Sequence, residues 1–123
     1  MLGNDAPIAS VAGEITPDKK YEFYSYESKY TDGGATLQIP ANISPKLLKK
    51  LQESALRTYK AIDARGCARV DFLIDRYTGQ CYLNEINTMP GFTKYSMYPK
   101  LWEASGIPYP ELLDRLIEFA LSE

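Results

Sequence analysis

The sequence has no histidine among its 123 residues, only two cysteines and no long hydrophobic run. Without imidazole, the chain lacks the side chain that most often acts as a general base or binds transition metals near neutral pH. Carboxylates, amides, lysine, arginine, tyrosine and serine must therefore supply any chemistry. The apolar runs are too short to cross a bilayer, and no segment has the form of a secretory signal. We therefore expect no membrane association.

The two cysteines, Cys67 and Cys81, favour a reducing, cytoplasmic setting in which both are packed thiols. A disulfide between them stays possible if the strands that flank them are neighbours. The formal net charge is −2, and lysine and arginine are spread along the chain, so the sequence gives no indication of nucleic-acid binding. A hydrophobic fraction of 45% and a charged fraction of 24% are typical of a soluble globular protein of one domain.

The first third of the chain is expected to consist of strands and loops. Residues 8–13 and the alternating residues 21–26 each predict a short strand, with a turn at 16–18 between them. Residues 29–40 contain adjacent glycines and end at a proline, which predicts a loop. Loops carried on a rigid scaffold often serve function.

Helical spacing dominates much of the rest of the chain. Ser44 and Pro45 predict a helix start, because serine caps the first turn and proline suits the first helical position. Apolar residues then recur at helical spacing up to Gly66, the predicted stop; they are Leu47, Leu48, Leu51, Ala55, Tyr59 and Ile62. A short helix is predicted over 98–105, with Trp102 in the core, and a last amphipathic helix from Pro110.

Residues 68–74 and 81–87 predict two strands of a hairpin, joined by the polar loop 75–80. If the hairpin is symmetric about Tyr77, Arg69 lies opposite Glu85 and Asp71 is the diagonal neighbour of Glu85. Because side chains alternate across a strand, these residues and Asn87 would then share one face of the sheet. A register slip of one residue would separate them.

Two carboxylates, one amide oxygen and one guanidinium on one face suggest a site for a hard cation. Mg²⁺ prefers oxygen ligands, commonly one or two carboxylates together with phosphate oxygens, and Asp71, Glu85 and Asn87 could supply the protein's share. Arg69 could neutralise negative charge on a phosphoryl group. From spacing alone, the alternative is an exposed hairpin with a cross-strand Arg–Glu pair that contributes less than about 1 kcal/mol.

Several segments resemble the C-terminal region of D-alanine–D-alanine ligases, a family of the ATP-grasp group. They are Gly66–Phe72, Tyr82–Thr93 and Tyr95–Lys100, together with Phe23–Tyr30, which resembles the mobile loop of that family, and Ile39–Ala41 after it. The string from Asn84 to Thr93 is highly specific, whereas the triplet at 69–71 recurs across the wider group. The resemblance implies an α+β fold for residues 1–123: the C-terminal half of an ATP-grasp fold, mainly antiparallel sheet packed by helices.

The resemblance also implies a role for individual residues. Asp71, Glu85 and Asn87 match positions that hold two Mg²⁺ or Mn²⁺ ions, and Arg69 and the backbone of Gly91 match groups that steady the reacting species. Ser96 and the backbone of Met97 match the site for the second D-alanine's carboxylate, and Tyr30 matches a residue that closes the substrate site. Lys29 matches a phosphate contact, and Phe23 and Asn84 match the lining of the nucleotide pocket. Trp102 is expected to be a core residue.

The implied reaction has two steps and uses D-alanine and ATP. ATP phosphorylates the carboxylate of one D-alanine, and the amine of a second D-alanine attacks the acyl phosphate, releasing phosphate. The product, D-alanyl-D-alanine, is used in peptidoglycan synthesis. Metal charge and positioning do most of the work in such phosphoryl transfers, which agrees with the absence of histidine.

Ligases of this family are much longer, and their N-terminal and central domains have no counterpart here. We therefore expect the 123-residue chain alone to lack ligase activity. Half of an ATP-grasp fold would leave a sheet edge uncovered, which favours a homodimer or other self-association.

There are four alternatives. A ligase that makes D-alanyl-D-lactate is disfavoured by Lys29–Tyr30 and the absence of histidine, whereas a D-alanine–D-serine ligase stays open. The chain could also be a non-catalytic fragment with weak nucleotide binding. Another ATP-grasp ligase is disfavoured by the segment 87–93.

Overall fold

The computed structural model describes residues 1–17, 35–93 and 96–122. The predicted strand at 21–26 and the candidate residues Phe23, Lys29 and Tyr30 lie outside these ranges. In chain order the elements are β1 (Glu14–Pro17), β2 (Ala35–Gln38), α2 (Pro45–Ala61), β3 (Arg69–Ile74), β4 (Cys81–Asn87), α3 (Met97–Ala104) and α4 (Tyr109–Leu121). The predicted α+β class is confirmed, and both sheets among the described residues are antiparallel pairs, β1–β2 and β3–β4.

The N-terminal strand was predicted in the wrong place. Within the segment 8–13, only Ile8 forms a β-bridge, with Leu2, and β1 begins at Glu14. The predicted turn at 16–18 overlaps this strand, because Thr16 and Pro17 pair with Thr36 and Ala35 of β2. Residues 35–38 had been assigned to a loop. Proline is tolerated in β1 because this strand is paired on one side only among the described residues.

Helix α2 starts where the sequence predicts. The side chain of Ser44 accepts a hydrogen bond from the backbone N–H of Leu47 at 3.1 Å, a cap that typically stabilises a helix by about 1 kcal/mol. Leu51, Ala55 and Tyr59 form the buried stripe. The helix ends at Ala61, before the predicted stop, and Ile62 is 49% exposed, so Ile62 does not belong to the buried face.

The first residues of the chain lie in the centre of the molecule. Met1 and Ala68 exchange backbone hydrogen bonds of 2.8 and 3.1 Å, which extends the β3 end of the hairpin by a short third segment. Two buried hydroxyls secure this segment: Tyr98 donates to the carbonyl of Met1 and Tyr59 to that of Gly3, both at 2.9 Å. The N-terminal segment thus joins the two core clusters, one around Tyr59 and one around Tyr98.

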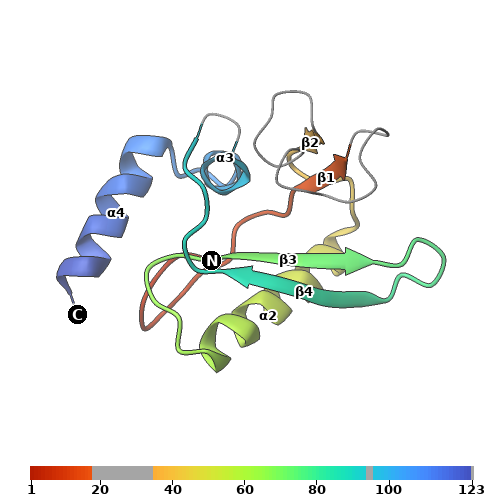
Figure 1. Ribbon diagram of the computed structural model, residues 1–123, viewed down its shortest axis with the longest axis horizontal. Helices are drawn as coiled ribbons and strands as arrows, with labels where there is room; N and C mark the ends of the chain where they lie inside the picture. Colours follow the sequence, from red (N-terminus) through yellow and green to blue (C-terminus); the bar gives the residue numbers. More distant parts are fainter. Residues whose placement is uncertain (18–34, 94–95, 123) are drawn as a thin grey trace.

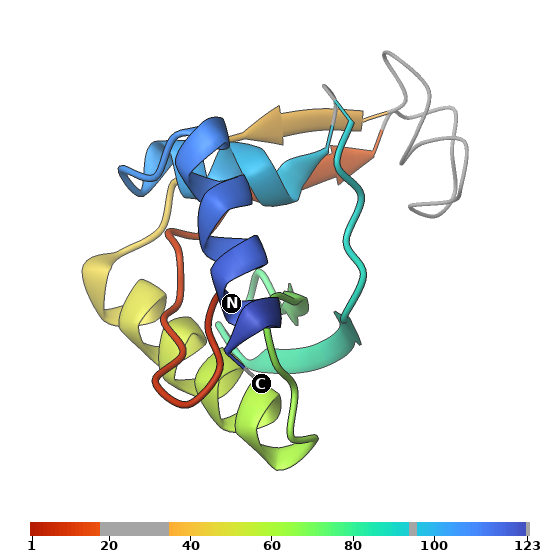
Figure 2. The ribbon, with the colours of Figure 1, turned by 90° about the vertical axis from the view of Figure 1, so that its left-hand side faces the viewer.

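The elements are arranged in layers. In Figures 1 and 2, α2 lies on one side of the β3–β4 hairpin, and β1, β2 and α3 lie on the other. Trp102 of α3 is 2% exposed, which confirms its prediction as a core residue. Helix α4 buries only Leu112, while Leu113, Ile117 and Leu121 of its predicted apolar side remain exposed. None of the described helices combines the length and the hydropathy that a membrane span needs.

Candidate metal site on the β3–β4 hairpin

The hairpin brings the predicted polar residues together, but in a different register from the predicted one. Arg69 lies opposite Asn87 and Asp71 opposite Glu85, whereas the symmetric hairpin had placed Arg69 opposite Glu85. The register shifts between Asp71 and Phe72, where β4 contains one extra residue, Asn84. A β-bulge of this kind cannot be seen in a period-2 pattern. All four polar residues still share one face, because directly opposed residues point to the same side.

Arg69 links the two carboxylates. Its Nε and Nη2 atoms donate to the two carboxylate oxygens of Asp71 at 2.8 and 2.9 Å, and Nη2 is 3.7 Å from Oε1 of Glu85. The side chains of Arg69 and Asp71 are 14% and 20% exposed, so this bidentate pair is partly shielded from water. Charge-assisted pairs of this geometry are among the stronger hydrogen bonds of proteins. The guanidinium therefore offsets the repulsion between two acidic groups on adjacent strands.

The donor chemistry of this face suits a hard cation. Asp71 and Glu85 provide carboxylate oxygens, and Asn87 provides an amide oxygen that also accepts a hydrogen bond from the N–H of Met89 at 3.0 Å. No group of three histidine, cysteine or acidic residues lies together in the described part of the chain. Two carboxylates and one amide are thus an incomplete shell, which fits Mg²⁺ because Mg²⁺ keeps waters and phosphate oxygens among its ligands.

The bulge gives Asn84 a distinct position. It has no directly opposed partner on β3, its side chain is exposed, and it lines a cavity together with Arg69 and Asp71. This cavity has a volume of about 730 Å³ and lies beside β3, with α2 and the segment 9–15 on its other walls. The predicted nucleotide-pocket residue Asn84 is therefore next to the candidate metal site.

The other described candidates follow β4: Gly91 and Ser96 lie in the loop, and Met97 is the first residue of α3. Ser96 occupies the N-cap position of α3 but makes no capping bond with its side chain. Its hydroxyl instead accepts from the N–H of Thr93 at 2.8 Å and lies 2.9 Å from the Thr93 hydroxyl. Met97 is 5% exposed, and a Cβ at Gly13 would lie 2.7 Å from its sulfur. The side chain of Met97 is therefore a packing group, and the role of its backbone stays a prediction.

Sequence reasoning assigned no role to Thr93, although Thr93 stands at the end of the specific string from Asn84. The contact between Thr93 and Ser96 orients the hydroxyl of Ser96 away from its capping position, so that Thr93 is a positioning residue for this candidate. A clue was present in the sequence: two hydroxyl residues lie three positions apart, directly before a helix.

The hairpin turn and the two cysteines have defined environments. At the turn, the backbone N–H groups of Thr78 and Tyr77 hydrogen-bond the carboxylate of Asp75 and lower its pKa.

Both cysteines are free thiols, and burial raises the pKa of Cys67. Cys81 pairs with Ile74 at the far end of the hairpin from Cys67, so the disulfide that the sequence left possible does not form.

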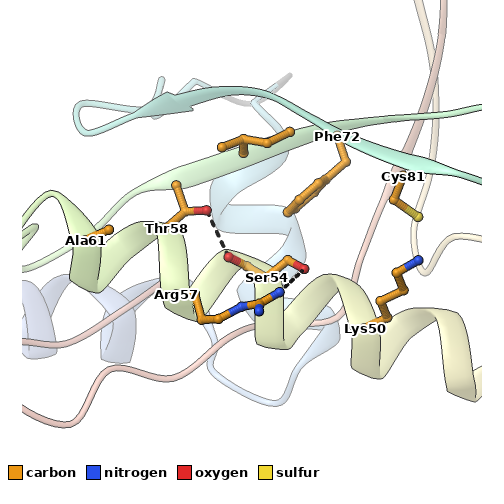
Figure 3. Close-up of a pocket in the computed structure, with 8 residues that line it drawn as sticks. Lys50, Ser54, Arg57, Thr58, Ala61, Phe72 and Cys81 are labelled. Atoms are coloured by element: carbon orange, nitrogen blue, oxygen red, sulfur yellow. Dashed lines mark hydrogen bonds between the residues drawn. The ribbon is translucent and has the colours of Figure 1, made fainter.

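A second cavity, of about 470 Å³, lies between α2 and the hairpin on the side away from the polar face (Figure 3). Two of its polar residues are hydrogen-bonded within α2: Arg57 donates to the hydroxyl of Ser54 at 3.4 Å, and Thr58 donates to the carbonyl of Ser54 at 2.9 Å. Phe72 and Leu83 contribute its apolar wall. None of the predicted site residues in the described ranges lines this cavity.

Comparison with known proteins adds independent information. The model of the family described as D-ala D-ala ligase C-terminus matches residues 1–118. A D-alanine–D-alanine ligase from Clostridium novyi is 53% identical over 121 residues, covering 98% of this chain and 35% of that protein. The corresponding protein from Deinococcus radiodurans is 53% identical over 123 residues and is covered to 36%. The chain therefore spans about a third of the length of the curated relatives it matches.

Solved structures agree with the sequence matches. A D-alanine–D-alanine ligase from Coxiella burnetii superposes with a TM-score of 0.80 at 42% identity, covering 98% of this chain and 30% of that one. A D-Ala:D-Ser ligase from Enterococcus faecalis superposes with a TM-score of 0.80 at 36% identity, covering 96% of this chain and 34% of that one. A D-alanine–D-alanine ligase from Bacillus anthracis complexed with ATP superposes with a TM-score of 0.72 at 33% identity, covering 92% of this chain and 36% of that one.

Proposed function

Because the chain belongs to the family of the D-alanine–D-alanine ligase C-terminus, we propose that it supplies the metal- and phosphate-binding part of such a ligase. The reaction is the ATP-dependent joining of two D-alanines for peptidoglycan synthesis, in the cytoplasm. The observation that carries the proposal is the convergence of Arg69, Asp71, Glu85 and Asn87 on one face of the β3–β4 hairpin. Oxygen ligands and a guanidinium side by side suit a polyphosphate with its cations.

Each of these residues has a defined task in the proposed chemistry. Asp71, Glu85 and Asn87 hold two Mg²⁺ or Mn²⁺ ions, which neutralise phosphate charge when they are bound. Arg69 and the backbone of Gly91 stabilise negative charge on the phosphoryl group and on the tetrahedral species that follows. Transfer of the γ-phosphoryl group from ATP to the first D-alanine's carboxylate gives D-alanyl phosphate and ADP. Attack by the second D-alanine's amine then forms the peptide bond and releases phosphate and a proton.

Further residues position the substrates. Ser96 and the backbone of Met97 bind the carboxylate of the second D-alanine, and Asn84 lines the nucleotide site. Phe23, Lys29 and Tyr30 lie outside the described residues, so their roles stay predictions. Phe23 would line the nucleotide pocket, Lys29 would contact phosphate, and Tyr30 would close the substrate site. No side-chain nucleophile is required, so the absence of histidine is compatible with the reaction.

A chimeric enzyme tests the proposal. The 123 residues replace the matching region of the Clostridium novyi ligase, and turnover is measured by ADP release and by mass spectrometry of the product. We expect D-alanyl-D-alanine from the parent chimera and a loss of at least about 100-fold with Asp71→Asn, because removing a charged group that acts in the transition state costs several kcal/mol. Asp114→Asn on exposed α4 is the matched control. Full turnover with Asp71→Asn would refute the proposed role.

The same chimera distinguishes D-alanine from D-serine as the second substrate. The similarity to the D-Ala:D-Ser ligase keeps D-serine as the second candidate. Competition between the two amino acids, with both products quantified, decides between them. For the isolated chain, we expect no ADP release above background with D-alanine, ATP and Mg²⁺; normal turnover would contradict the assignment of the chain as one part of the catalytic unit.

A further inference from the structure

Thr93 and Ser96 are joined by three contacts at the end of the loop that precedes α3. The backbone N–H of Ser96 donates to the carbonyl of Thr93 at 3.0 Å, and the N–H of Thr93 donates to the hydroxyl oxygen of Ser96 at 2.8 Å. The two hydroxyl oxygens lie 2.9 Å apart, which is a hydrogen-bond distance that allows the proton to run in either direction. The direction decides what the hydroxyl of Ser96 offers to a ligand.

The two directions give Ser96 opposite chemical characters. A serine hydroxyl has one proton and two lone pairs, and one lone pair of Ser96 already accepts from the N–H of Thr93. If Ser96 donates to the hydroxyl of Thr93, its proton is used and only a lone pair faces a ligand. If Thr93 donates to Ser96, both lone pairs are occupied and the proton of Ser96 faces a ligand. A carboxylate only accepts hydrogen bonds, so it requires the second arrangement.

The start of α3 favours an anionic ligand at the same place. Ser96 stands at the N-cap position, but its side chain makes no capping hydrogen bond, and the first turn contains no acidic residue. The N–H groups of a first helical turn carry partial positive charge and attract a carboxylate. Because Thr93 holds the hydroxyl of Ser96 on the loop side, this hydroxyl does not occupy the N–H groups of the turn.

We propose that the hydroxyl of Thr93 donates to Ser96 and thereby makes the second amino-acid site a site of hydrogen-bond donors only. The proton of Ser96 is then directed at the carboxylate of the second D-alanine. Thr93 is a positioning residue that selects a carboxylate over a carboxamide without touching the substrate. A carboxamide presents an NH₂ group, and a site built from donors leaves that group unpaired. The inference rests on the proposed function, because it concerns how the site assigned to Ser96 and Met97 chooses its ligand.

Competition between D-alanine and D-alaninamide in the Clostridium novyi chimera tests this role. D-Alanine is the first substrate of both products, so the ratio of D-alanyl-D-alanine to D-alanyl-D-alaninamide, measured by mass spectrometry at one pH, reports on the second site. Thr93→Val keeps the shape of the side chain and removes its hydroxyl, and we expect it to lower this ratio about three- to tenfold, the effect of one hydrogen bond. Thr93→Ala should lower the ratio similarly, whereas Thr93→Ser should keep it within about twofold.

Two further backgrounds separate positioning from packing. Thr58→Val removes a hydroxyl that donates to the carbonyl of Ser54 in α2, and it should leave the ratio unchanged. In a Ser96→Ala background, Thr93→Val should cause no further change, because Thr93 acts through Ser96. An active chimera in which Thr93→Val keeps the parent's ratio, or lowers it equally with and without the Ser96 hydroxyl, would overturn this inference alone. A parent chimera that forms no dipeptide would overturn the proposed function and this inference together.

Discussion

Asp71 is the residue on which the hairpin site depends, because it faces a like charge across the strands and an opposite charge along its own strand. Glu85 lies directly opposite, and Arg69 binds both oxygens of Asp71 while approaching Glu85. A cation held by the two carboxylates would take over part of the charge balance that Arg69 provides. Asp71 and Glu85, the carboxylates that bind metal in the proposal, therefore destabilise the hairpin when Arg69 is removed.

This reasoning gives a prediction for Arg69→Met. We expect the free energy of unfolding to fall by about 1–3 kcal/mol, because the partly shielded carboxylate of Asp71 loses its bidentate partner and the exposed carboxylate of Glu85 loses a nearby positive charge. Arg115→Met is the matched control: its pair with Glu111 on the surface of α4 is 38% and 46% exposed, so its loss should cost less than about 1 kcal/mol. Urea titration of both variants measures the difference. Equal losses would show that Arg69 contributes no more than a surface ion pair.

At the scale of elements, sequence patterns predicted the helices and the hairpin wherever interactions between residues close in the chain determine the structure. Helix α2 follows from the cap at Ser44 and its apolar spacing, and the hairpin follows from two apolar runs around a turn that Asp75 closes. The register was wrong by two residues at Arg69. Next to the turn, Ile74 already pairs with Cys81, one residue beyond a hairpin symmetric about Tyr77, and the extra residue Asn84 shifts the pairing by one more in the middle of β4. The strand β2 was missed because its partner β1 lies across residues 18–34, and a pairing at that distance leaves no periodic trace in a four-residue strand.

Close packing of α3 against the N-terminal segment gives a prediction for Gly13→Val. A Cβ at this position would lie 2.7 Å from the Met97 sulfur and 3.0 Å from Leu101, and both side chains belong to α3. We expect the variant to lose about 1–3 kcal/mol of unfolding free energy, the usual cost of overpacking. Because Met97→Ala makes room, the same substitution should cost less in a Met97→Ala background, which a double-mutant cycle measures. Equal costs in both backgrounds would place the strain elsewhere.

At the scale of the whole molecule, the N-terminal segment holds the layers together, which no pattern in the sequence predicts. Asn4 accepts from the N–H of Gly66 and donates to the carbonyl of Phe119, joining the start of β3 to α4. Tyr59 and Tyr98 reach the same segment from α2 and α3. These contacts span most of the chain, so no local pattern encodes them.

The burial of Met1 makes the stability of the 123-residue chain with a free amine depend on pH. In the folded state the pKa of this amine is about 5, against 8.0 in the unfolded state. Between these values the unfolded state binds a proton that the folded state does not, so the free energy of unfolding decreases as the pH falls from 8 to 5. Below pH 5 both states are protonated and this contribution stays constant.

The size and the specificity of the effect can both be measured. A pKa shift of this extent corresponds to a loss of up to about 4 kcal/mol in the free energy of unfolding as the pH falls from 8 to 5. Because the chain contains no histidine, no side chain has its ordinary pKa near the middle of this range, which leaves the amine as the principal titrating group. Urea unfolding at half-unit pH steps should therefore show a slope in the chain with the free amine and almost none in the same chain acetylated at Met1. Parallel slopes in the two chains would mean that the amine of Met1 is not buried in solution.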